Sequence, residues 1–121
     1  MRRVWRMLKA LCMASSVTFL SIPILAAFHI VAPLFAPIIG GYWAGSNLRL
    51  SDGEAALLGL GSGLLIGLPL PAIQLGLGYF HYLSPLVIGL FAVVFALYTG
   101  ALVGFSAWLG TATAIEDTAV P

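Results

Sequence analysis

Two long segments of the sequence, residues 10–48 and 55–115, contain no Asp, Glu, Lys or Arg. A membrane-spanning helix needs about 20 apolar residues, because each residue rises 1.5 Å and the hydrocarbon is about 30 Å thick. The 121-residue chain is 61% hydrophobic and 7% charged, whereas about a quarter of a soluble domain is charged. A soluble fold could not cover so much apolar surface. The sequence therefore predicts an all-α integral membrane protein.

Two positions in the sequence carry the chemistry of a helix start. Ser51 followed by Glu54 matches a capping box, in which each side chain bonds a backbone N–H left free in the first turn. Ser84 followed by Pro85 places a good N-cap before a proline, whose missing N–H costs nothing at the first helical position. We expect helices to begin near Asp52 and near Pro85.

Prolines predict where the first of these helices ends. Pro69 and Pro71 should end or bend it, because a proline cannot donate the helical hydrogen bond. Residues 71–84 then form a connector. The Tyr-Phe-His-Tyr run at 79–82 is typical of the aromatic belt at a membrane surface.

The first uncharged segment leaves two alternatives open. A single straight helix over residues 10–47 would be about 57 Å long, too long for an upright span. We favour a tilted, kinked span over residues 17–47. The alternative is a helical hairpin broken at Pro33 to Pro37, which gives four spans in place of three.

The expected organisation is a single membrane domain with three spans. Its parts are a basic amphipathic N-terminus (1–16), a kinked first span (17–47), a second span (52–70), an interfacial connector (71–84), a third span (85–110) and a short polar tail (111–121). We interpret the first apolar segment as a retained span and not as a cleaved signal peptide.

Positive charges at the start of the chain predict its orientation. Arg2, Arg3, Arg6 and Lys9 precede the first span, and basic residues flanking a span stay in the cytoplasm. We therefore expect the N-terminus on the cytoplasmic side of a cytoplasmic-type membrane. Three spans would put the acidic tail outside, and four would put it inside.

Small residues recur at four-residue spacing in every predicted span. The positions are Ala32, Ala36, Gly40 and Ala44, with Gly41 and Gly45 alongside; Ala55, Gly59, Gly63 and Gly67; and Ala92, Ala96, Gly100 and Gly104. Residues four apart share a helix face. Faces without bulky side chains let helix backbones approach closely in lipid, where packing drives association. These small-xxx-small stripes either hold the chain's own helices together or face another subunit.

His29 is the candidate cofactor ligand, because an ionisable residue at membrane depth is costly and often functional. A neutral imidazole there suits a haem iron or a chlorophyll-type pigment. The alternative is a histidine that hydrogen-bonds to a neighbouring helix. His81 fits interface anchoring better than ligation, and no metal site is predicted.

The charged cluster between the two apolar segments has two interpretations. Arg49, Asp52 and Glu54 could form a small ionic site. We favour a solvated turn that caps a helix and stops it from crossing the membrane.

Sequence motifs do not predict an enzyme. The chain has no HExxH, no CxxC and no P-loop lysine. Its net charge of +1 argues against nucleic acid as a partner, and no soluble substrate is evident. Bound lipid is the expected small-molecule partner.

We therefore expect a small accessory subunit of a larger membrane complex, which contributes helix packing and assembly through contacts with other transmembrane subunits. One alternative is a self-assembling channel, transporter or holin-like pore, although its spans offer few polar lining residues. The other is a pigment- or haem-binding subunit that uses His29.

Overall fold

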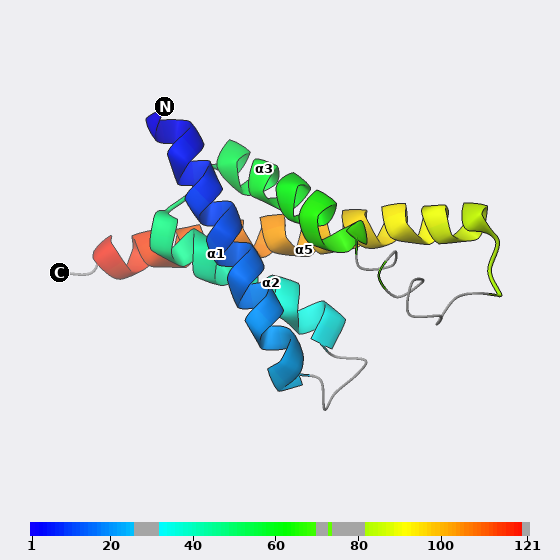
Figure 1. The fold of residues 1–121 in the computed structure, drawn as a ribbon. Coiled ribbons are helices and arrows are strands. Elements are labelled where there is room, and N and C mark those ends of the chain that lie inside the picture. The colour runs from blue at the N-terminus through cyan, green and yellow to red at the C-terminus, as the bar shows by residue number, and fades with distance from the viewer. Residues whose placement is uncertain (26–31, 70–72, 74–81, 120–121) are drawn as a thin grey trace.

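The computed structural model describes residues 1–25, 32–69, 73 and 82–119, and within them the chain is all-helical. The helical elements are α1 (Arg2–Leu25), α2 (Ala32–Leu48), α3 (Asp52–Ser62), the π-helix η1 (Gly63–Gly67) and α5 (Pro85–Ala119). α5 runs along one axis of the molecule, and the α1–α2 pair crosses it (Figure 1). Most of the predicted connector, together with His29 and His81, lies outside the described residues.

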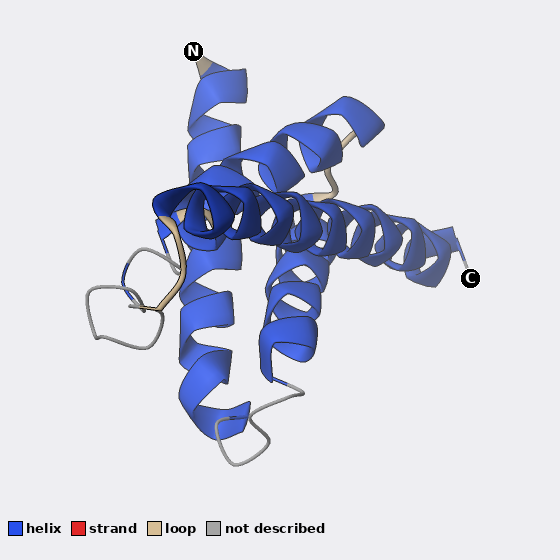
Figure 2. Ribbon diagram, turned by 90° about the vertical axis from the view of Figure 1, so that its right-hand side faces the viewer, coloured by secondary structure: helices blue, strands red, loops and turns tan. Residues whose placement is uncertain are grey.

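Helices α1 and α2 pack against each other as an antiparallel hairpin (Figure 2). Arg6, near the start of α1, bonds the carbonyl of Arg49 after the end of α2 at 3.3 Å. Further along α1, Ala14 and Thr18 face Gly40 in the middle of α2. The favoured single kinked span over residues 17–47 is therefore wrong.

The positions of the prolines explain this difference. Pro33 is the second residue of α2 and Pro37 lies inside that helix. A missing N–H is tolerated in the first turn, where the backbone donors have no helical partner. Pro33 therefore stands at the start of a new helix, whereas Pro37 lies beyond the first turn, where its missing N–H costs the helix one hydrogen bond. The hairpin alternative is closer to the structure, but Pro33 and Pro37 lie within α2 and do not separate it from α1.

Helix α3 begins at Asp52, where both hydrogen bonds of the Ser51–Glu54 capping box are present. It widens into the π-helix η1 after Ser62, and the N–H of Leu68 bonds the carbonyl of Gly63 at 3.0 Å. The widened turn directly precedes Pro69. A proline ring clashes with the carbonyl four residues before it, and such sites open helices into π-turns.

Helix α5 begins at Pro85, and the Ser84 hydroxyl accepts a 3.4 Å hydrogen bond from the N–H of Val87. The helix runs 35 residues to Ala119, so it continues well into the predicted polar tail. α5 contacts α2, α3 and η1. In the part of the chain that the structure describes, α5 is the one helix that is long and apolar enough to cross a membrane.

The described core is built mostly from alanines, with Leu50, Leu58 and Val103 among them. It contains Ala10, Ala14, Ala44, Leu50, Ala55, Leu58, Val103 and Ala107. Large apolar side chains point outward instead, and Leu60, Leu64 and Leu97 are all exposed. Only 17% of the apolar stretch of α5 is buried within the chain, which differs from the core helix of a soluble protein.

Candidate helix-packing site

One close helix contact joins α3 and η1 to the middle of α5. A Cβ atom at Gly59 would lie 2.5 Å from the carbonyl oxygen of Gly100, and one at Gly63 would lie 2.5 Å from that of Ala96. Gly104 faces Ala55 and Gly59 in the same way, and Gly67 faces Ala96. Two of the predicted stripes therefore lie against each other, with backbone on backbone.

The stripe of α2 divides between two neighbours. Gly40 faces Ala14 and Thr18 of α1. The next residue, Gly41, faces Val103 and Ser106 of α5, and Gly45 faces Ala107. Ala36 and Ala44 are buried, and Ala32 is the first residue of α2. α2 is thus wedged between α1 and α5 through two adjacent small faces.

Small residues on α1 and at the end of α5, which the sequence pattern did not predict, also take part in this packing. Ala10, Ala14 and Thr18 are buried at four-residue spacing on α1. Gly110 of α5 faces Tyr42 and Ser46 of α2. The spacing rule applied to residues 10–18 would have found those on α1, but the charged N-terminus was interpreted as interfacial.

Buried hydroxyl groups fall into two kinds. Most bond a carbonyl of their own helix: Thr18 donates to Ala14, and Ser106 donates to Leu102, both at 2.7 Å. Ser62 and Thr99 are 0% and 1% exposed, and their hydroxyls have no hydrogen-bond partner in the structure. These two side chains mark the interior between the α3–α5 pair and the α1–α2 hairpin.

Glu54 lies in the polar turn ahead of the apolar part of α3, and it is only 5% exposed. Its carboxylate accepts hydrogen bonds from the Ser51 N–H at 2.9 Å and from Arg6 of α1 at 2.8 Å. Arg3 lies at 3.9 Å. The Ser51 backbone bond holds the pKa of the Glu54 carboxyl below its usual value; burial opposes the shift and the two arginines add to it. The favoured solvated turn is therefore wrong at Glu54, which ties α1 to α3.

A second polar contact ties α5 to the same turn. The N–H of buried Leu50 donates to the Thr111 hydroxyl at 3.0 Å. The Thr111 hydroxyl is also 3.2 Å from the Gly45 carbonyl and 3.1 Å from that of Ala107. We name the start of α1, the α2–α3 turn and the last part of α5 the polar end of the molecule. Both termini lie toward this end in Figure 1.

The described residues contain no group of three or more His, Cys, Asp and Glu side chains placed to hold a metal ion. Their chemistry is that of close helix packing, with a partly buried ion pair between Arg6 and Glu54 at the polar end. Comparison of the chain with protein-family models, curated proteins and solved structures finds no match.

Proposed function

We propose that this chain is an integral membrane protein in which α1, α2, α3 with η1, and α5 each traverse the bilayer. The supporting observation is the distribution of side chains, with small residues between helices and large apolar residues outside. Lipid solvates such a surface, and close backbone contact stabilises helix pairs in it. The 17 residues of α2 extend about 26 Å, a mismatch that a bilayer absorbs by local thinning.

The polar end supports a topology with both termini on one side. Arg6 meets Arg49 and Glu54, and Leu50 meets Thr111, so the start of α1 and the last part of α5 both contact the α2–α3 turn. The positive-inside rule assigns this end to the cytoplasm. This proposal replaces the three-span arrangement with four helical segments.

We further propose that the protein is a structural subunit of a larger membrane assembly. Support comes from the first part of α5, which projects beyond the other helices (Figure 1). Leu86, Leu90 and Val94 are exposed there, and a Cβ atom at Gly89 would meet nothing within 4 Å. We name residues 85–94 the projecting segment. A neighbouring transmembrane helix would cover it and gain the dispersion contacts that favour association in lipid.

Native mass after extraction tests this role. The tagged protein is extracted from its own membranes in a mild detergent, and its mass and composition are measured. We expect a complex with other polypeptides. A homo-oligomer of this chain alone would overturn the subunit role and favour a self-assembling pore.

A matched pair of leucines tests the projecting segment. Leu90 in that segment and Leu20 on α1 are both 68% exposed. We expect Leu90→Asn to release the co-extracted subunits and Leu20→Asn to retain them. Equal retention in both variants would exclude the projecting segment as the contact.

A further inference from the structure

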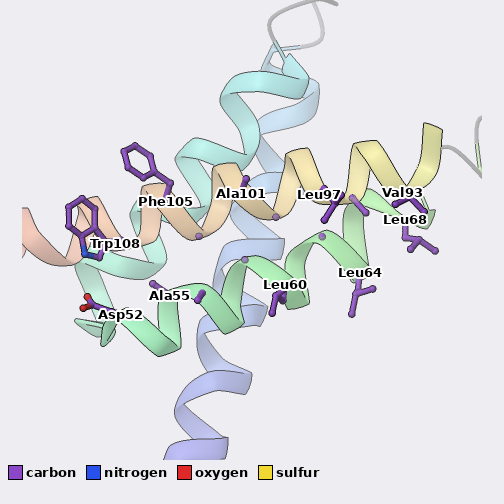
Figure 3. A pocket seen from close by; sticks show the side chains of 16 residues that line it. Asp52, Ala55, Leu60, Leu64, Leu68, Val93, Leu97, Ala101, Phe105 and Trp108 are labelled. Atoms are coloured by element: carbon purple, nitrogen blue, oxygen red, sulfur yellow. The ribbon is translucent and has the colours of Figure 1, made fainter. Parts of the chain in front are cut away.

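An apolar groove of about 710 Å³ runs between α3–η1 and α5 (Figure 3). Its floor is made of small residues, including Gly59, Gly63 and Gly100, and its walls include Leu60, Leu64 and Leu97. Along α5 it extends from Val93 to Trp108, about 22 Å at the helical rise. Its volume falls within the range of about 300–1,000 Å³ typical of small-molecule sites.

The groove lies on the face of the α3–α5 pair that the α1–α2 hairpin leaves open. Gly59 and Gly63 on α3–η1 meet Gly104 and Gly100 on the antiparallel α5. In an antiparallel helix pair, the residues that come just before the contacting glycines in the sequence lie on one side of the plane through the two helix axes. The residues that come just after those glycines lie on the other side. Leu58 and Val103 precede, and they pack in the core with α1 and α2. Leu60 and Phe105 follow, and they line the groove.

Among the residues that the structure describes, Asp52 is the only charged one that lines the groove, and it lies at one end of it with Trp108 (Figure 3). Within the described chain no Arg or Lys forms an ion pair with Asp52. Phe105 and Trp108 stack with ring centroids 6.0 Å apart, and Trp108 is the aromatic residue at the Asp52 end of the groove. Carboxylates pair with ammonium ions, and aromatic faces attract them.

We propose that this groove binds one acyl chain of a zwitterionic phospholipid whose ammonium headgroup lies at Asp52 and Trp108. Asp52 belongs to the polar end, so the groove starts at the membrane surface and runs inward, as a lipid does. One leaflet of the hydrocarbon is about 15 Å deep, and the groove is long enough for a chain of that leaflet. A transmembrane helix would instead set an apolar face against the Asp52 carboxylate at a cost in desolvation.

This inference rests on the proposed membrane insertion, and quenching of tryptophan fluorescence by brominated lipid tests both separately. The full chain is reconstituted into phosphatidylglycerol vesicles that contain a fixed fraction of lipid brominated on its acyl chains. Quenching of its three tryptophans (Trp5, Trp43 and Trp108) establishes insertion. The variant Trp5→Phe, Trp43→Phe then reports on Trp108 alone.

From the quenching of Trp108 we derive the relative affinity of the groove for the two brominated lipids. We expect the affinity for phosphatidylethanolamine to be about two- to fivefold higher than that for phosphatidylglycerol, which is the difference that one exposed ion pair would produce. Asp52→Asn should remove this preference. Glu116→Gln is the matched control, because Glu116 is exposed on α5 and does not line the groove. Circular dichroism establishes that each variant is folded.

Two outcomes would overturn the proposal while leaving insertion intact. Equal quenching by the two lipids would make the groove ordinary lipid-facing surface. No quenching of Trp108, with Trp5 and Trp43 still quenched in the full chain, would mean that protein covers the groove. No quenching of any tryptophan would overturn the proposed insertion itself.

Discussion

The guanidinium of Arg6 and the carboxylate of Glu54 meet at 2.8 Å, although 48 residues separate them in the sequence. Glu54 also accepts the Ser51 N–H at the start of α3. One carboxylate therefore caps α3 and fixes α1 beside it. The side chain of Glu54 is almost fully buried, whereas that of Arg6 is half-exposed, so the loss of Arg6 leaves a buried anion with fewer partners.

Arg6→Met should lower the free energy of unfolding by about 1–2 kcal/mol, because a hydrogen bond to a buried charged group is lost and the partial exposure of Arg6 limits its strength. The free energy of unfolding is measured by titration with dodecyl sulfate in mixed micelles, with circular dichroism as the readout. Arg2→Met is the control, with an expected change within about 0.5 kcal/mol, since Arg2 is exposed. Equal losses in the two variants would contradict a specific role for the ion pair.

Stability should depend on pH through Glu54. Its pKa is lower in the folded chain than the ordinary value of 4.5, so its contribution is complete above pH 4.5. That contribution is lost as the pH falls from 4.5 through the folded pKa. The same unfolding measurement between pH 7 and pH 3 should show this loss in the parent and a smaller loss in Glu54→Gln. Parallel pH profiles would refute the assignment.

Substitution of glycine by alanine should destabilise the protein where the glycine contacts another helix, and should not where the glycine has open space around it. Gly63→Ala should destabilise the protein by about 1–3 kcal/mol, since its Cβ would meet the Ala96 carbonyl and overpacking forces the helices apart. Gly89→Ala, with open space around it, should be neutral or stabilise by up to about 1 kcal/mol. Gly63→Leu and Gly100→Leu should weaken helix association further. Unchanged stability in the Gly63 and Gly100 variants would show that these faces are not interfaces.

Thr111→Val should cost about 1–3 kcal/mol, because the buried N–H of Leu50 loses its acceptor and an unsatisfied buried donor is costly. Thr113→Val is the control. Its hydroxyl bonds Tyr42 at 3.0 Å at an exposed position, so its replacement should cost about 0.5 kcal/mol. Thermal unfolding of both variants in the same detergent checks the difference, and a larger effect at Thr113 would contradict it.

Arg49 adopts a left-handed backbone with φ of 46° at the end of α2, where glycine is usual. Arg49→Gly and Arg49→Ala both remove the charge, but only glycine relieves the steric cost. We expect the glycine variant to be more stable than the alanine variant by about 1 kcal/mol. An alanine variant as stable as the glycine variant, in the dodecyl-sulfate titration, would disprove the strain.

Local chemistry in the sequence predicts where helices start. Ser51 with Glu54, and Ser84 with Pro85, mark the first residues of α3 and α5, because capping depends on neighbours within one turn. The spacing of small residues predicts which helix faces lack bulky side chains. It does not predict the partner, since Gly40 and Gly41 are adjacent and face different helices.

Long-range pairing is what the sequence leaves open. The end of α1 at Leu25 carries no polar turn residue, and the hairpin is held by contacts such as Gly40 with Ala14. The burial of Glu54 follows from Arg6, which comes from another helix. Three charged residues close together in the sequence, such as Arg49, Asp52 and Glu54, are typical of a solvated turn. The local sequence therefore favoured an interpretation that is wrong at Glu54.

The convergence of charge at the polar end bears on how the chain enters a membrane. All nine charged residues (five basic and four acidic) lie in residues 2–9, 49–54 and 116–117, and none lies in the two segments that the proposed topology carries across. The α1–α2 hairpin and the α3–α5 pair can therefore each be inserted without moving an ion through hydrocarbon, a step that costs several kcal/mol per charge. Biogenesis then needs only the partitioning of apolar helices, and the charges at the polar end keep both termini on the side of synthesis.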